Sequence, residues 1–181
     1  MHIKLNVSLL TLFSLFFISC EGPISPYKIE LQDNEISCLI DQELFTGELV
    51  FANLKKFDGY LQLEIDAFKD NNSVHCSIIL EDDQFVGTYY FDKKTFNGVT
   101  YSTNNVKYLK GSEEGNKLYS SHYCDEANGQ VEITKFDMVE KTCSGFIHSK
   151  ICYKDEESGI VDKLTISECR FYNIAFQLVN N

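Results

Sequence analysis

Short runs of alternating apolar and polar residues recur along most of this chain. In the run "GYLQLEIDAF", residues 59–68, four apolar side chains alternate with three polar ones. Because successive side chains of a strand point to opposite faces of a sheet, this alternation predicts a strand with one buried face. The buried face would carry Leu61, Leu63, Ile65 and Ala67.

Similar runs are separated by turn sequences such as "KDNN", "EDDQ", "NG", "GSEEGN", "DEANG" and "KDEESG". Runs of this length, bounded by Gly, Asn and Asp, are typical of strands joined by tight turns. They do not alternate with long helical segments, so the sequence predicts an all-β fold: a single antiparallel β-sandwich or barrel-like domain of about ten strands. The other runs cover residues 35–40, 44–51, 73–80, 85–91, 117–124, 129–136, 143–153, 161–167 and 170–179.

One segment within this region is ambiguous. In "TGELVFANLKKF", residues 46–57, the apolar positions Leu49, Ala52, Leu54 and Phe57 also fit a brief amphipathic helix. Helix, strand and loop therefore all stay open for these residues.

The chain begins with a segment typical of a signal peptide. Lys4 is followed by a largely apolar stretch from Leu5 to Ile18. That stretch is shorter than the roughly 20 residues that a helix needs to cross a bilayer, which favours a cleaved leader.

Two processing sites compete at the end of this leader. "FISC", residues 17–20, resembles a bacterial lipobox, in which small and apolar residues precede a cysteine that is diacylated and becomes the new N-terminus. Phe17 stands where leucine is more usual. Cleavage after Gly22 would instead satisfy the small-residue rule of a general signal peptidase and release a soluble protein. We favour lipidation of Cys20, because the lipobox resemblance ends at this cysteine. Its acyl chains would hold the domain stably at a membrane surface.

These readings divide the chain into three parts. Residues 1–19 form a lipoprotein signal peptide, and residues 20–34 form the lipidated cysteine and a flexible tether, which contains both prolines of the protein. Residues 35–181 form the β-domain.

The charge balance argues against one class of partner. The formal net charge is −11, and nucleic-acid binding depends on phosphate neutralisation by Lys and Arg. The acidic residues are spread through turns, which is typical of a solvated surface. Nucleic acid is therefore not expected as a partner.

Seven cysteines are present, and setting Cys20 aside leaves an even number. An even set in an exported chain indicates disulfides, although buried free thiols are an alternative. No C-x-x-C pair is present, so a structural zinc site is not expected. The remaining six are Cys38, Cys76, Cys124, Cys143, Cys152 and Cys169.

One cysteine pairing can be tested by register. If the strands on either side of residues 155–157 form a regular hairpin, Cys143 lies directly opposite Cys169, close enough for a disulfide. A single bulge near Ser167–Glu168 would break this register. Elimination then leaves the pairs Cys38–Cys76 and Cys124–Cys152.

No catalytic or cofactor motif stands out. His75, His122 and His148 fall in three separate runs, and no G-x-S-x-G sequence is present. Calcium-loop spacing and glycine-rich phosphate loops are missing as well. We therefore expect no enzyme, metal or cofactor; a secreted hydrolase that uses turn carboxylates is the alternative. Acidic turn residues occur at Asp82–Asp83, Glu113–Glu114, Asp125–Glu126 and 155–157.

The aromatic content includes ten Tyr and fourteen Phe. Tyrosine offers an apolar face with a polar tip, which suits sugars and protein surfaces. Ordinary strand packing is the favoured explanation, and a protein or glycan ligand is the alternative. The tyrosines concerned are Tyr89, Tyr90, Tyr101 and Tyr108.

The C-terminal part resembles an uncharacterised family of lipoproteins from Bacteroidota. That family carries the pattern G-x-I-x-I-T-x-F-D, then K-x-I-S-G-T-F, then V-x-I-T-x-G-x-F. Two positions differ, since Cys143 replaces an apolar residue and Cys169 stands where glycine is usual. Upstream, "SCLIDQELFTGE" and "VGTYYF" take the places of two further family segments. The matching residues are Gly129, Val131, Ile133, Thr134, Phe136, Asp137, Lys141, Ser144, Gly145 and Phe171.

The resemblance implies a small β-sandwich or barrel-like domain and no established activity. The residues themselves suggest structural roles: an Asp at position 137 can bond backbone amides two residues on, and Gly145 inside a strand indicates a bulge or a close backbone approach. We expect a membrane-anchored extracytoplasmic lipoprotein of the cell envelope, facing the periplasm or the exterior. It would contact the membrane through its lipid and act as a binding or structural module, or else as a soluble secreted binding domain.

Overall fold

The computed structural model describes residues 31–80, 85–96, 99–102, 104–113, 115–124, 129–155, 157–159 and 161–180. Nearly every element is a strand, as expected, and one short 3-10 helix, η1 (Ser121–Tyr123), follows β10. No helix in this described part is long and apolar enough to span a membrane. The strands are β1 (Glu35–Ile40), β2 (Glu43–Thr46), β3 (Leu49–Phe57), β4 (Tyr60–Lys69), β5 (Asn72–Leu80), β6 (Gly87–Tyr90), β7 (Lys93–Phe96), β8 (Val99–Ser102), β9 (Asn105–Lys110), β10 (Lys117–Ser120), β11 (Gly129–Asp137), β12 (Thr142–Lys154) and β13 (Val161–Asn180).

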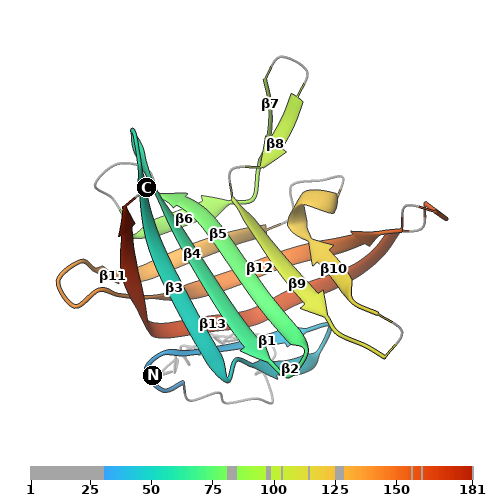
Figure 1. Cartoon of the computed structure of the whole chain (residues 1–181), viewed down its shortest axis with the longest axis horizontal. Coiled ribbons are helices and arrows are strands. Elements are labelled where there is room, and N and C mark those ends of the chain that lie inside the picture. Colours follow the sequence, from blue (N-terminus) through green and yellow to red (C-terminus); the bar gives the residue numbers. More distant parts are fainter. Residues whose placement is uncertain are drawn as a thin grey trace, which may run out of the picture.

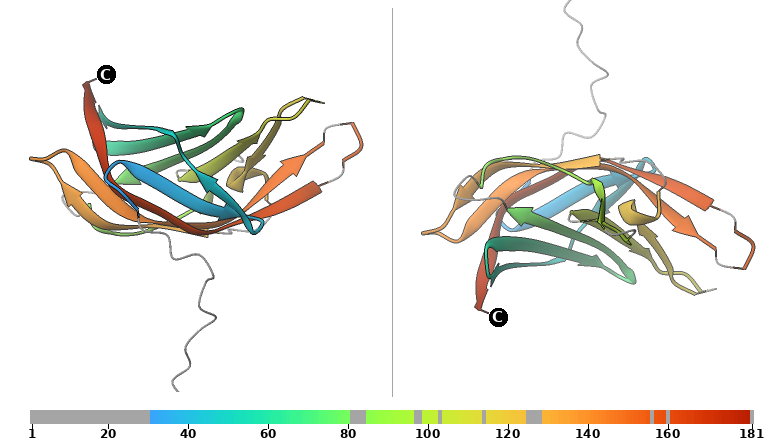
Figure 2. Two further views of the ribbon diagram at one scale, coloured as in Figure 1. Left: turned by 90° about the horizontal axis from the view of Figure 1, so that it is seen from below. Right: turned by 90° about the horizontal axis from the view of Figure 1, so that it is seen from above.

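Eleven strands form one sheet in the order β2-β1-β13-β3-β4-β5-β9-β10-β12-β11-β6. An additional pairing of β12 with β13 joins two distant strands of this order, so the sheet partly closes into a ring (Figure 1). Neighbouring strands are antiparallel except for β13 and β3, which are parallel. Strands β7 and β8 form a separate hairpin that projects from the sheet. The views from below and from above show that the sheet curves around one interior (Figure 2).

The long strand β13 holds the ring together. It pairs with β12 and β1 along its first part and with β3 at its end. The sequence predicts two strands here, 161–167 and 170–179, whereas the structure has one. Glu168 and Asn173, with φ of 48° and 44°, lie where the pairing register shifts. Such bulges bend a strand without ending it, and the bend lets β13 reach three partners.

The interior of the curved sheet is the hydrophobic core. The predicted buried face of residues 59–68 is confirmed: Leu63, Ile65 and Ala67 are fully buried, and Leu61 packs against the core as a partly buried residue. Fully burying an Ile or Leu side chain stabilises the fold by about 1.5–3 kcal/mol. The largest fully buried side chains come from both halves of the chain: Ile36, Leu54, Leu63, Ile65, Ile78, Leu80, Ile133, Ile147, Ile151, Ile166, Phe171 and Ile174.

The ambiguous segment at 46–57 is a strand. Val50, Ala52 and Leu54 are buried at alternate positions, and the segment pairs with β4 and β13, so period two prevails over the helical pattern. The predicted single strand 44–51 is split, because the Gly47 N–H donates to the Ile36 carbonyl and the next amide, Glu48, donates to Phe68. At this point the chain stops pairing with β1, as β2, and begins to pair with β4, as β3.

Candidate ligand pocket

Four of the predicted cysteines form two disulfides in the structure. Cys124 is bonded to Cys152, a pair that the sequence left by elimination. Cys38 is bonded to Cys169. Cys20, the predicted lipidation site, lies outside the described residues.

The predicted pairs Cys143–Cys169 and Cys38–Cys76 are wrong. Cys143 lies opposite Ile174, and Cys169 lies opposite Ile147. The first pair of this hairpin is Lys154–Val161, three residues later than predicted, and the bulges of β13 shift the register further. The bulge at Glu168 lies at the position, Ser167–Glu168, where a bulge was expected to break the predicted register. Cys38 is on β1 beside β13, while Cys76 is on β5 between β4 and β9. Cys76 and Cys143 are buried free thiols.

The three histidines are not brought together. His75 on β5 lies 2.7 Å from the Asp66 carboxylate on β4, whereas His122 is in η1 and His148 is exposed on β12. Within the described residues, no group of three or more His, Cys, Asp or Glu side chains could hold a metal ion.

Two acidic side chains in described turns accept hydrogen bonds from the backbone. Asp155 accepts hydrogen bonds from the amides of Glu157 and Ser158. Asp137 accepts from the amides of Val139 and Glu140, which confirms its predicted turn role. Residues Asp82, Asp83, Glu114, Asp125, Glu126 and Glu156 lie outside the described part of the chain.

The tyrosines do not form one cluster. Tyr89 and Tyr90 are on β6, Tyr108 is on β9, and the Tyr101 side chain lies outside the description. Tyr108 belongs to a row of aromatic side chains at one end of the partly closed sheet. Successive ring centroids are 6.4, 6.3 and 5.8 Å apart along Phe45, Tyr108, Tyr119 and Tyr153.

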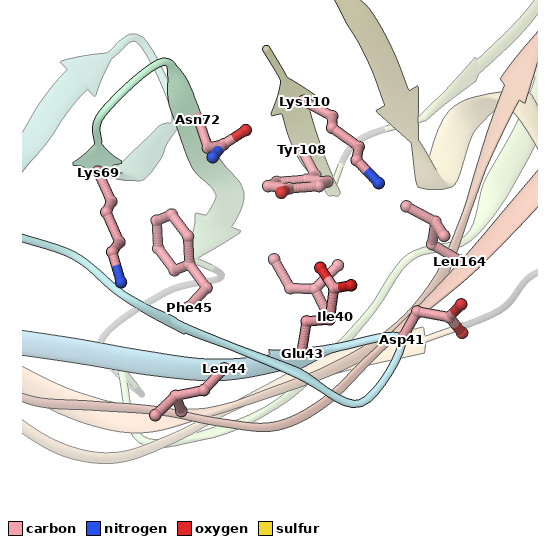
Figure 3. Close-up of a pocket in the computed structure, with 10 residues that line it drawn as sticks. All are labelled: Ile40, Asp41, Glu43, Leu44, Phe45, Lys69, Asn72, Tyr108, Lys110 and Leu164. Carbon is pink, nitrogen blue, oxygen red and sulfur yellow. The ribbon is translucent and has the colours of Figure 1, made fainter. Parts of the chain in front are cut away.

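The same end of the ring carries a pocket of about 180 Å³ (Figure 3). It lies where the β1–β2 turn faces the ends of β4, β5 and β9, with Leu164 of β13 at its side. Its lining combines apolar and charged side chains: Ile40, Asp41, Glu43, Leu44, Phe45, Lys69, Asn72, Tyr108, Lys110 and Leu164.

Opposite charges line two walls of this pocket. Lys69 and Lys110 come from β4 and β9, and Asp41 and Glu43 come from the β1–β2 hairpin. Figure 3 shows the ammonium groups of Lys69 and Lys110 at opposite ends of one wall, the Glu43 carboxylate reaching toward Lys110 from the other wall, and the Asp41 carboxylate pointing away from the pocket. Among the described residues, no ion pair joins either lysine to either carboxylate. Lys110 and Glu43, which point toward the same space, are therefore available to a ligand.

The floor between these walls is apolar and buried. Phe45 and Tyr108 are nearly inaccessible and meet edge to face, an arrangement that aromatic pairs favour. Burial raises the pKa of Tyr108, and the nearby Glu43 carboxylate raises it further. The Tyr108 hydroxyl is therefore a neutral polar group near Glu43.

Local structure fixes the walls. Asp41 and Gln42 have φ of 49° and 72°, as a type I′ hairpin turn requires, and the Asp41 amide donates to the Thr165 carbonyl at 2.8 Å. On the facing wall, Asn72 Oδ1 accepts from the Gly111 amide at 3.0 Å. A Cβ on Gly111 would lie 2.5 Å from the Asn71 Cβ, so glycine permits the two loops to pack closely.

A larger hollow of about 520 Å³ lies at the other end of β4. Its described lining is mostly apolar and includes the stacked rings of Phe57 and Tyr60, with Lys56 as its one charged side chain. Leu80 and Phe85 border residues outside the described part of the chain. The charged end pocket is the better candidate for binding a polar ligand.

Sequence reasoning found only part of this pocket. It singled out Tyr108 as aromatic and placed Lys69 and Asn72 in the turn sequence "KDNN", while Asp41 fell within the family segment "SCLIDQELFTGE". None of the last three was given a role in binding. No sequence feature of Glu43, Lys110 or Leu164 indicated a role in ligand binding. A charged residue beside a turn is ordinary on any surface, and only the ring topology brings these turns together.

Comparisons with known proteins complete this description. Searches of curated proteins and of solved structures find no match to this chain. A family model does match, over most of the described domain and including the residues that carry the sequence resemblance. The chain belongs to the family of the domain of unknown function DUF6252, whose model matches residues 32–175.

Proposed function

We propose that this protein is an extracytoplasmic binding module, held at a membrane by acyl chains on Cys20, and that its ligand binds in the end pocket. The observation that carries the binding role is the pocket itself, which two lysines and two acidic residues line; among the described residues no ion pair joins them. Concave sites with an apolar floor and a few converging polar groups are typical of ligand binding.

The disulfides support an extracytoplasmic location. Disulfides persist in oxidising compartments and are rare in the cytosol. Cys38–Cys169 and Cys124–Cys152 both lie within the buried part of the domain. Their presence agrees with an exported chain and with the leader that precedes Cys20.

The tether sets how far the pocket can lie from the membrane. Ten residues lie between Cys20 and Leu31, where the described structure begins. Fully extended, the eleven steps from Cys20 to Leu31 span at most about 40 Å. The domain would therefore work close to the membrane surface, with freedom to turn its pocket toward a ligand.

The hydrolase alternative has less support. It relied on turn carboxylates, and Asp155 uses its carboxylate to accept hydrogen bonds from the backbone of its own turn. These bonds lower the pKa of Asp155. A carboxylate with a lowered pKa is a poor general acid at neutral pH.

The anchor is tested by metabolic labelling with a fatty-acid analogue in a bacterial host. We expect Cys20→Ser to abolish the label and release the protein from the membrane fraction, while Ser25→Ala in the tether changes neither. An intact mass that starts at Pro23 without acyl chains would reject the anchor and favour the soluble secreted module.

The pocket is tested by amide chemical shifts of the full chain carrying Cys20→Ser. The probes are L-leucine, glucose, acetate and methylammonium at millimolar concentration. We expect at least one probe to shift the amides of Asp41, Tyr108 and Gly111, which border the pocket. If no probe shifts them, the proposed binding role of this pocket is wrong.

A further inference from the structure

We infer that the end pocket binds a free α-amino acid with an aliphatic side chain. The inference rests on the proposed binding function and names the chemical class of its ligand. The carboxylate of the amino acid would lie against Lys110, and its ammonium group against Glu43 (Figure 3).

The distribution of charge selects a zwitterion. A ligand with only negative charge would meet Glu43 as well as Lys110, and a ligand with only positive charge would meet Lys110 as well as Glu43. Like charges at short range cost binding free energy. A molecule that carries both charges on neighbouring atoms satisfies both walls at once, since the walls face each other across a small cavity (Figure 3).

The size of the pocket limits the ligand to one small molecule. An apolar cavity of roughly 150 Å³ holds a benzene molecule, whereas drug-sized ligands occupy roughly 300 Å³ or more. The volume of about 180 Å³ lies close to the lower of these values. A single amino acid is suited to this space, and a longer peptide would have to extend into solvent.

The apolar lining favours an aliphatic side chain over a sugar. Sugars stack on open aromatic faces, but Phe45 is 5% exposed and Tyr108 is 8% exposed, so neither offers an open face. Ile40, Leu44 and Leu164 surround the rings with branched aliphatic groups. Apolar contact with these groups would contribute to the affinity for leucine, isoleucine or valine.

The inference is tested by calorimetric titration of the full chain carrying Cys20→Ser. The ligands are L-leucine, leucinamide, which lacks the carboxylate, and N-acetyl-leucine, which lacks the ammonium group. Because each analogue removes one charge-assisted contact, we expect each to bind at least about 10-fold more weakly than leucine.

Variants assign this preference to the pocket. We expect Glu43→Gln and Lys110→Gln each to weaken leucine binding at least about 10-fold. Glu132→Gln on β11 and Lys150→Gln on β12, both exposed and away from the pocket, should leave the affinity unchanged. Thermal unfolding of every variant checks that the fold is intact.

The outcomes separate the ligand class from the binding role. If leucinamide or N-acetyl-leucine binds as tightly as leucine, or if only glucose, acetate or methylammonium shifts the pocket amides, the amino-acid class is wrong and the binding role stands. If leucine binds but Glu43→Gln and Lys110→Gln do not weaken it, the assigned charges are wrong. If no probe reaches the pocket, both proposals fail.

Discussion

Cys38 on β1 is bonded to Cys169 on β13, and both side chains are fully buried in the core. The bond joins residues that are 131 positions apart in the sequence, so it closes almost the whole domain into one covalent loop. The second bond, Cys124–Cys152, closes a loop of only 28 positions. The two bonds therefore constrain the unfolded chain to different extents.

The longer loop predicts a larger loss of stability when its bond is removed. Loop-closure entropy gives about 2–4 kcal/mol for a typical disulfide, and the longer loop should exceed the shorter by about 1 kcal/mol. We expect Cys38→Ser/Cys169→Ser to lower the free energy of unfolding more than Cys124→Ser/Cys152→Ser, as measured by urea denaturation. A greater loss from the second pair would contradict the loop-closure explanation.

The two free thiols should be hidden in the folded protein. Burial raises the pKa of Cys143 to about 12, and burial together with the nearby Cys143 raises the pKa of Cys76. Since the thiolate is the reactive form, we expect labelling by a thiol reagent at pH 8 to be more than about 100-fold slower in the native state than in denaturant.

The same labelling counts the thiols. In denaturant without reductant, the chain carrying Cys20→Ser should react at two thiols, those of Cys76 and Cys143. A chain with no reactive thiol would carry a third disulfide instead.

Asp137 makes the β11–β12 turn sensitive to acid. The amides of Glu140 and Val139 lower its pKa in the folded state. A lowered pKa stabilises the fold above the ordinary value near 3.9, and that contribution is lost as the pH falls through the lower folded value. We expect Asp137→Asn, which can still accept the amides, to flatten the decline of the melting temperature between pH 5 and pH 2. An unchanged decline would show that this carboxylate is not responsible.

Gly145 on β12 permits a close approach of strands. A Cβ at this position would collide with the Glu132 carbonyl oxygen and lie 2.6 Å from Phe171 Cζ. Overpacking of this kind costs about 1–3 kcal/mol, so Gly145→Ala should lower the free energy of unfolding by that amount. Gly87→Ala on β6, where a Cβ meets nothing within 4 Å, should have little effect in the same denaturant titration.

Local patterns predicted most of the strands, because the alternation that favours a strand depends on residues close together in the sequence. The alternation at 59–68 gives β4, and the run at 35–40 gives β1 without a change of bounds. Asp137 and Gly145 were likewise recognised by residue type and position. The segments 93–96, 99–102 and 105–110, which form β7, β8 and β9, were missed because their alternation is short or interrupted.

Pairing was predicted less well because it depends on register. One unpaired residue at Glu168 moves every later contact of β13, and a second at Asn173 moves them again. Cys143–Cys169 failed because pairing of β12 with β13 begins three residues later than predicted, with Lys154 opposite Val161, and the bulges add to this shift. Cys38–Cys76 failed because the strand order was unknown. Cys124–Cys152 is present because η1 brings Cys124 beside the end of β12.

The sequence by itself determined that the chain is built from strands, which faces they bury and where most turns fall, since these depend on residues close together in the chain. Only the tertiary structure decided which strands pair, how the sheet partly closes into a ring and which turns share an end of it. The end pocket belongs to this second group: Asp41, Glu43, Lys69 and Lys110 meet only because strand order and the bends of β13 bring three separate hairpin ends together.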